Sequence, residues 1–196
     1  MTNPIYISRN DDSFDYFICN LPENDNEKLV AIENGIVSRE ALKNIDGIEH
    51  VFLDKCIKIE EFGFENCKDL RNVIWQVKSS TKEKCIKTGE KSDRIKGLEI
   101  CNIEDLEIQR AAFKNCSKLQ TVIFPIVSGN LVIEKEAFAG CTELRTLVFP
   151  KENVNPKSVF IDDEAFLGCS NLTFICNSES VMPCFARAHD FKIVTL

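Results

Sequence analysis

Hydrophobic residues in the stretch 136–150, EAFAGCTELRTLVFP, follow a spacing that fits neither a single helix nor a single strand. Phe138, Cys141, Leu144, Leu147 and Phe149 lie three, three, three and two residues apart. A helix repeats about every 3.6 residues and a strand every two, so the spacing predicts a short helical or 3₁₀ turn followed by a strand. The same pattern recurs at 110–125 and 164–177. The chain therefore contains a repeat.

Six copies of the repeat align on one anchor position each. The weakest copy keeps Ile95, Leu98 and Ile100 but has Gly89 and Ser92 where the clear copies have phenylalanine and cysteine. Successive anchors are 22, 25, 24, 25 and 28 residues apart, at Leu42, Phe64, Gly89, Phe113, Phe138 and Phe166. Periods of this length are typical of leucine-rich-repeat solenoids.

The full pattern, I-x-x-x-A-F-x-x-C-x-x-L-x-x-V-x-F-P, resembles the BspA-type leucine-rich repeat. The resemblance covers residues 36–176, and the ending SESVMPCFARAHDFKIVTL resembles the closing segment of such arrays, a short helix and a last strand. It implies a leucine-rich-repeat fold. For function it implies either a surface antigen or adhesin, or an intracellular interaction module.

The predicted fold is an α/β repeat, a solenoid of about six coils of 22–28 residues. Short parallel strands form its concave face, and short helical or 3₁₀ turns follow second extended pieces that end at Ile108, Ile133 and Ile161. Residues 1–35 are predicted to cap the first coil and residues 177–196 the last. Between them, 36–176 form the six repeats, of which the third (about 76–100) is degenerate and carries a basic loop.

Four of the ten cysteines, Cys67, Cys116, Cys141 and Cys169, occupy one slot of the repeat. Ile45 takes this slot in the first repeat, and isoleucine cannot replace a disulfide partner or a metal ligand. We interpret the slot as a small buried hydrophobe. Coils about 5 Å apart would also let oxidation link neighbouring thiols. With no CxxC pair and two histidines, the sequence predicts no metal site and no cofactor.

Composition narrows the possible partners. The net charge of −7 disfavours a nucleic-acid partner, and no run of 18 apolar residues predicts membrane insertion. The first twenty residues lack the basic and apolar regions of a signal peptide. We expect a cytoplasmic protein, or a cell-surface or secreted one if a leader has been removed.

The predicted partner-binding surface lies on the strands, at positions between the inward-pointing residues. One slot holds five apolar residues among six and forms a stripe: Phe52, Ile74, Glu99, Ile123, Val148 and Cys176. Neighbouring slots add a polar and basic rim: His50, Asn72, Thr121, Thr146, Arg71 and Arg145. A solvent-exposed apolar stripe with such a rim is typical of a binding surface. Strand propensity alone is the other explanation of the β-branched residues.

Two further segments are candidates for function. Residues 76–97 hold seven Lys or Arg and three acids, which suits an acidic partner or a phosphate, or simply a solvated loop. Cys184 and His189 have the residue types of a thiol nucleophile and its base. Cys–His sites are assembled in space rather than along the sequence, so this pair does not predict an enzyme.

Taken together, the sequence favours a non-catalytic protein–protein interaction module that presents a leucine-rich-repeat sheet to a protein partner. Two alternatives remain at this point. One is a cell-surface antigen or adhesin of the BspA type, and the other is a structural protein that self-associates as a homo-oligomer.

Overall fold

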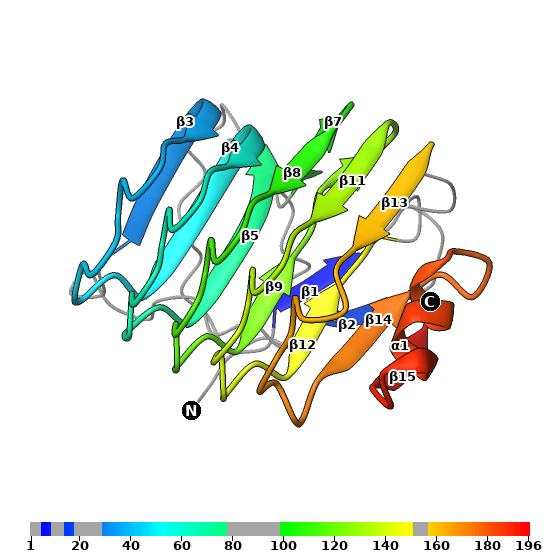
Figure 1. Cartoon of the computed structure of the whole chain (residues 1–196). Coiled ribbons are helices and arrows are strands. Elements are labelled where there is room, and N and C mark those ends of the chain that lie inside the picture. Colours follow the sequence, from blue (N-terminus) through cyan, green and yellow to red (C-terminus); the bar gives the residue numbers. More distant parts are fainter. Residues whose placement is uncertain (1–4, 9–13, 18–28, 78–98, 151–156) are drawn as a thin grey trace, which may run out of the picture.

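The computed structural model describes residues 5–8, 14–17, 29–77, 99–150 and 157–196. Parallel strands stack coil upon coil into a β-solenoid (Figure 1). Its longest series of paired strands, called the long row here, is parallel throughout. In order, the long row contains β3 (Leu29–Val37), β4 (His50–Ile59), β5 (Asn72–Val77), β9 (Thr121–Ile123), β12 (Thr146–Val148), β14 (Thr173–Cys176) and β15 (Lys192–Thr195).

A second series, called the short row, lies along another side of each coil. It consists of the far ends of β3 and β4, then β8 (Leu106–Ile108), β11 (Asn130–Ile133) and β13 (Ser158–Ile161). These last three strands confirm the predicted extended pieces. β10 (Ile126–Val127) also pairs with β7 (Asn102–Ile103). Among the described strands β13 has a neighbour on one side only, β11, so it forms the edge of the short row.

Each coil passes from the short row to the long row through a tight turn, and the five turns centre on Leu42, Phe64, Phe113, Phe138 and Phe166. The turns are not helical. Phe62 and Asn66, on either side of Phe64, have φ of 61° and 58°. Helices need negative φ at every residue. The predicted helical or 3₁₀ turns are therefore not confirmed, and successive β-turns with a left-handed third residue take their place.

Backbone hydrogen bonding explains why these turns do not close into a helix. Every second N–H group donates to the neighbouring coil instead of to its own turn. Phe64 donates to the carbonyl of Ala112 at 2.7 Å, and Asn66 to that of Lys114 at 2.9 Å. The ladder between coils thus continues through the turns as it does through the strands.

The core contains two columns of stacked aromatic rings, one behind the turns and one behind the long row, packed among buried aliphatic residues. In the first column, ring centroids are 5.0, 5.0 and 5.3 Å apart along Phe64, Phe113, Phe138 and Phe166. In the second they are 5.8, 4.4 and 5.8 Å apart along Trp75, Phe124, Phe149 and Phe174. The predicted inward direction of these side chains is confirmed, and each stacked pair contributes about 0.5–1.5 kcal/mol beyond burial.

Gly89 and Ser92 of the predicted third repeat lie outside the described residues. Phe64 stacks directly on Phe113, and β5 pairs directly with β9, so these two coils are neighbours. Five turns stack and enclose four full circuits, and the predicted six coils are not confirmed. At the end of β5 the chain instead pairs antiparallel with β6 (Glu99–Ile100), Gln76 opposite Ile100. Residues 78–98, including most of the predicted basic segment, lie outside the described residues.

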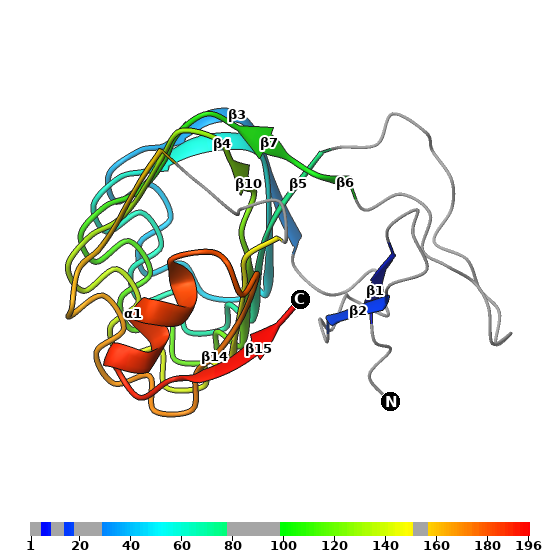
Figure 2. The ribbon, with the colours of Figure 1, turned by 90° about the vertical axis from the view of Figure 1, so that its right-hand side faces the viewer.

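The C-terminal segment packs on the end of the solenoid, whereas the N-terminal hairpin lies outside the long row. Helix α1 (Met182–Ala188) lies across the C-terminal end of the solenoid and buries Met182 and Ala186 (Figure 2). α1 and β15 fall where the sequence predicted a short helix and a last strand. β1 (Ile5–Ser8) and β2 (Phe14–Phe17) form an antiparallel hairpin outside the long row (Figures 1 and 2). The first strand of the ladder is β3 itself.

Candidate binding surface at the C-terminal end of the solenoid

The apolar stripe predicted to bind a partner is buried. Ile74, Ile123 and Val148 have 0% of their surface exposed and form a second, small apolar cluster on the outer side of the long row. Phe52 packs against this cluster and is half-buried. The predicted solvent exposure of the stripe is therefore wrong. Its role in binding stays a prediction.

Most of the predicted polar rim is also covered. His50, Asn72 and Thr121 are buried, and the Asn72 amide nitrogen lies 3.0 Å from His50 Nδ1. Arg71 is half-buried and its Nε donates to Glu49 Oε2 at 3.0 Å. Of the rim residues named in the sequence prediction, Thr146 is half-buried and only Arg145 is exposed.

The last two members of the stripe occupy other positions than predicted. Glu99 lies in β6, opposite Val77 in an antiparallel pair, and so is not part of the parallel ladder. Cys176 points into the core, because Ile175 is the residue that pairs with Val148. The last coil is one residue shorter here, since Leu172 and Phe174 are two apart whereas Leu144 and Leu147 are three apart. This deletion shifts the following strand by one position.

The four cysteines that share one slot of the repeat form a column, and their thiols make hydrogen bonds that the sequence pattern did not reveal. Each thiol donates to the carbonyl of the anchor residue in the preceding coil, for example Cys116 to Phe64 at 3.1 Å and Cys141 to Phe113 at 3.1 Å. The first coil has no described turn before it, and there Ile45 stands exposed. Burial raises the pKa of Cys67 and Cys169 to about 12. All eight cysteines in the described ranges are free thiols.

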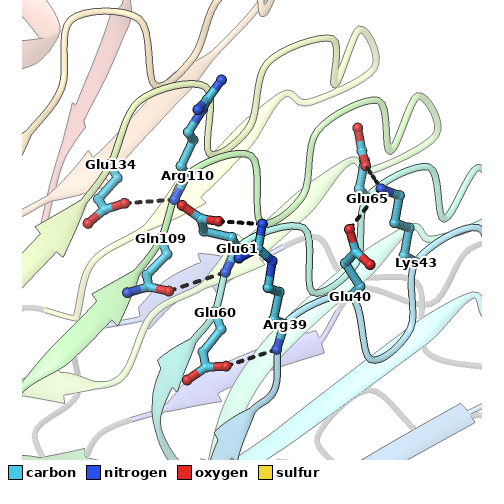
Figure 3. A network of polar contacts seen from close by, with 9 residues as sticks. All are labelled: Arg39, Glu40, Lys43, Glu60, Glu61, Glu65, Gln109, Arg110 and Glu134. Atoms are coloured by element: carbon cyan, nitrogen blue, oxygen red, sulfur yellow. Dashed lines mark hydrogen bonds and ion pairs between the residues drawn. The ribbon is translucent and has the colours of Figure 1, made fainter.

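A column of polar side chains fastens the coils on the side of the turns (Figure 3). One acceptor per coil receives a backbone N–H of the coil before it: Glu60 from Arg39 at 2.9 Å, Gln109 from Glu61 at 3.2 Å and Glu134 from Arg110 at 2.8 Å. Beside it, Lys43 bridges Glu40 at 3.3 Å and Glu65 at 2.9 Å. The column mixes both charge signs and connects neighbouring coils.

Cys184 and His189 have different surroundings. Cys184 is exposed on α1, whereas His189 Nε2 lies 3.3 Å from Asp163 Oδ1 and its ring packs on Phe185 at 4.3 Å. The neighbours recorded for His189 are thus an acid and two phenylalanines, Phe185 and Phe191. Among the described residues, no group of three His, Cys, Asp or Glu side chains lies close enough to hold a metal ion.

Exposed large apolar residues gather at the ends of the solenoid, above all at the C-terminal end. Phe160 on β13 is 53% exposed and Val181, before α1, is 51% exposed. They line a hollow of about 220 Å³ together with Val159, Ile161, Met182 and Phe185. A second hollow of about 330 Å³ lies beside the last turn, where Leu167 is 58% exposed.

This surface was missed in the sequence because Phe160 looks like an ordinary outward strand position. The available signal was its place in the array: VFI at 159–161 is the last of the three predicted extended pieces, and in the structure β13 pairs only with β11 among the described strands. In the described part of the chain no helix is long and apolar enough to cross a membrane.

Comparison with known families gives one match. The model of the BspA type leucine rich repeat region matches residues 35–173 in six copies. Searches of curated proteins and of solved structures found no match. The family model covers more than half of the chain, and the stacked coils and aromatic columns agree with it. The chain belongs to the BspA-type leucine-rich repeat family.

Proposed function

We propose that this protein is a non-catalytic interaction module that presents the C-terminal end of its solenoid to a protein partner. The observation that carries the proposal is the apolar hollow between β13 and α1, with Phe160 and Val181 at its rim. Exposed apolar groups that cluster on a folded surface tend to mark interaction sites, whereas isolated ones are ordinary.

The rest of the molecule suits this role because the surface is held in place before binding. Phe166 contacts Phe138 in the core column and Phe185 on α1, so the cap is packed onto the last coil. The hollow is thus built on hydrogen-bonded coils and a docked helix. A preorganised surface loses little conformational entropy when it binds a partner.

The proposal is tested by comparing three proteins in a pull-down from native lysate: the wild type, Phe160→Asp, and the matched control Ile57→Asp. Ile57 is 47% exposed on β4, away from the C-terminal end, so both variants place an acid at an exposed apolar site. We expect a specific band that is lost with Phe160→Asp and retained with Ile57→Asp, with unchanged circular dichroism. Equal retention by both variants would reject the hollow as the binding surface.

A further inference from the structure

The last turn of the solenoid carries hydrogen-bond donors that every earlier turn uses to hold the next coil. In the second, third and fourth turns, the anchor and the residue two positions later each donate a backbone N–H to the neighbouring coil. The bonds from Phe113 to Ala137 and from Asn115 to Ala139 are 2.7 and 2.8 Å long. Those from Phe138 to Ala165 and from Gly140 to Leu167 are both 2.8 Å long.

The same two donors of the last turn have no acceptor among the described residues. Phe166 and Gly168 stand at these positions, and no hydrogen bond from either N–H group is recorded. The N–H of Glu164, two residues before the anchor, is by contrast satisfied by Asp162 Oδ1 at 2.9 Å. The ladder that runs through all five turns therefore ends with two open donors, which are two residues apart in the sequence.

These donors border the hollow of about 330 Å³ beside the last turn. Its wall also includes the exposed Leu167, together with His189 and Phe191 from the C-terminal segment. Asp163 lies at the rim with 91% of its side chain exposed. The hollow thus combines backbone donors with an apolar wall, and an extended peptide segment that joins a sheet edge uses main-chain hydrogen bonds and side-chain pockets of this kind.

We propose that the last turn binds an extended segment of a partner protein, whose alternate carbonyl oxygens accept hydrogen bonds from Phe166 and Gly168. The proposal rests on the interaction function above and adds to it a defined site and a defined partner chemistry. Ala165 and Leu167 of the last turn give the internal template: they run alongside the fourth turn and supply alternate carbonyls to the N–H groups of Phe138 and Gly140.

A second copy of the chain does not fit this site as a stacked coil. In each coil the turn comes after a long-row strand in the same chain. If the first turn of a second copy stacked on Phe166, the β3 strand of that copy would have to occupy the long-row position after β12. That position is occupied by β14, with β15 beyond it. A free segment of another protein avoids this conflict. Asp162 and Asp163 at the turn favour a lysine or arginine in that segment.

The experiment uses a peptide with the sequence of residues 109–116, acetylated, amidated and with serine in place of Cys116. In the solenoid this basic segment supplies the carbonyls of Ala112 and Lys114 to Phe64 and Asn66. Backbone amide NMR of the full chain follows Phe166 and Gly168, with Phe138 and Gly140 as matched internal controls. In the free protein we expect Phe166 and Gly168 to exchange with solvent at least tenfold faster than their controls.

Saturation with millimolar peptide should shift the Phe166 and Gly168 amides and slow their exchange, and leave Phe138 and Gly140 unchanged. Leu167→Ser should weaken peptide binding at least fivefold, and Ile57→Ser should not. The proposal is overturned if the two amides are as protected as their controls in the free chain, or if they do not respond to the peptide. A partner that is captured from lysate equally well by Leu167→Ser leaves the interaction function standing but rejects this site.

Discussion

The fourth and last turns have nearly the same sequence and quite different surroundings. EKEAFAGC at 134–141 and DDEAFLGC at 162–169 share five of their eight residues. In the fourth turn Phe138 is stacked on both sides and its N–H is bonded to the next coil. In the last turn no further coil of the described chain stacks on Phe166, and Phe185 of α1 and Phe191 contact its ring instead. The position of a repeat in the array, more than its sequence, thus decides whether its groups serve folding or are available for binding.

The sharpest test of this comparison is truncation of the two anchor phenylalanines. Phe138→Ala should lower the free energy of unfolding by about 3–5 kcal/mol, because the cavity interrupts the ring column in the middle of the core. Urea titration measures the loss, and a value below about 1 kcal/mol would contradict the central role of the ring. Phe166→Ala should act locally, with α1 and β15 losing amide protection before the other coils.

The glycines of the two turns should also differ. A Cβ at Gly140 would lie 2.5 Å from Asn115 Oδ1, whereas one at Gly168 would meet its nearest neighbour at 3.7 Å. Both have positive φ, 75° and 87°, which costs an alanine about 1–2 kcal/mol. We expect thermal unfolding to show a larger loss for Gly140→Ala than for Gly168→Ala.

A companion variant refines this prediction. Asparagine stands at the matching position of the second and third turns, where Asn115 Nδ2 donates to Asn66 Oδ1 at 3.1 Å. Gly140→Asn should therefore cost less than Gly140→Ala, since asparagine tolerates the left-handed region and can extend this column. Equal losses for the two variants would show that the clash, and not the backbone conformation, sets the cost.

Replacement of the column cysteine should have a smaller effect. Cys141→Ala removes the thiol bond to the Phe113 carbonyl and leaves a small cavity, and we expect a loss of about 1–2 kcal/mol. Cys169→Ala, whose bond to Phe138 is longer at 3.3 Å, should cost no more than Cys141→Ala. Denaturant titration of both variants under reducing conditions decides the order. The opposite order would indicate that the cap depends on Cys169.

The smallest expected effect concerns acid sensitivity. The hydrogen bond from Lys114 lowers the pKa of Glu136 in the fourth turn, and that from Lys118 lowers the pKa of Asp69. A folded-state pKa below the unfolded value gives stability that is present above the unfolded pKa, about 4, and is lost as the pH falls through the folded pKa. Lys114→Met should flatten the pH dependence of unfolding below about pH 5. Lys157→Met, an exposed control whose partner Glu104 is 3.8 Å away, should not.

The sequence predicted the inward-facing residues well, because stacking inside the solenoid requires similar side chains at the same position of each coil. Phe64, Phe113, Phe138 and Phe166 recur since only inward rings can stack from coil to coil. The interval of 49 residues between Phe64 and Phe113 predicted two periods, and the coil expected between them is not confirmed. Spacing alone cannot distinguish a degenerate repeat from an insertion between adjacent coils. The structure adds that Phe64 stacks directly on Phe113 and that β5 pairs directly with β9.

The candidate surface was less predictable for a physical reason. Strand alternation placed Ile74, Ile123 and Val148 correctly on the side away from the core, but alternation does not tell what covers that side. Likewise, Glu136 and Glu164, or Gly140 and Gly168, look alike in the sequence. The residues of the last turn lack a following coil because the ladder of turns stops there, and their remaining contacts depend on how α1 packs.

The direct pairing of β5 with β9 also bears on how such an array can change over time. Val77 and Glu99, which flank residues 78–98 in the sequence, lie opposite each other in an antiparallel pair. The ends of the intervening segment are therefore clamped together whatever its length. Doubling such a loop costs only about 0.6 kcal/mol of closure entropy. The junction can accept a longer segment, or an entire foreign domain, while the aromatic columns on either side keep their register.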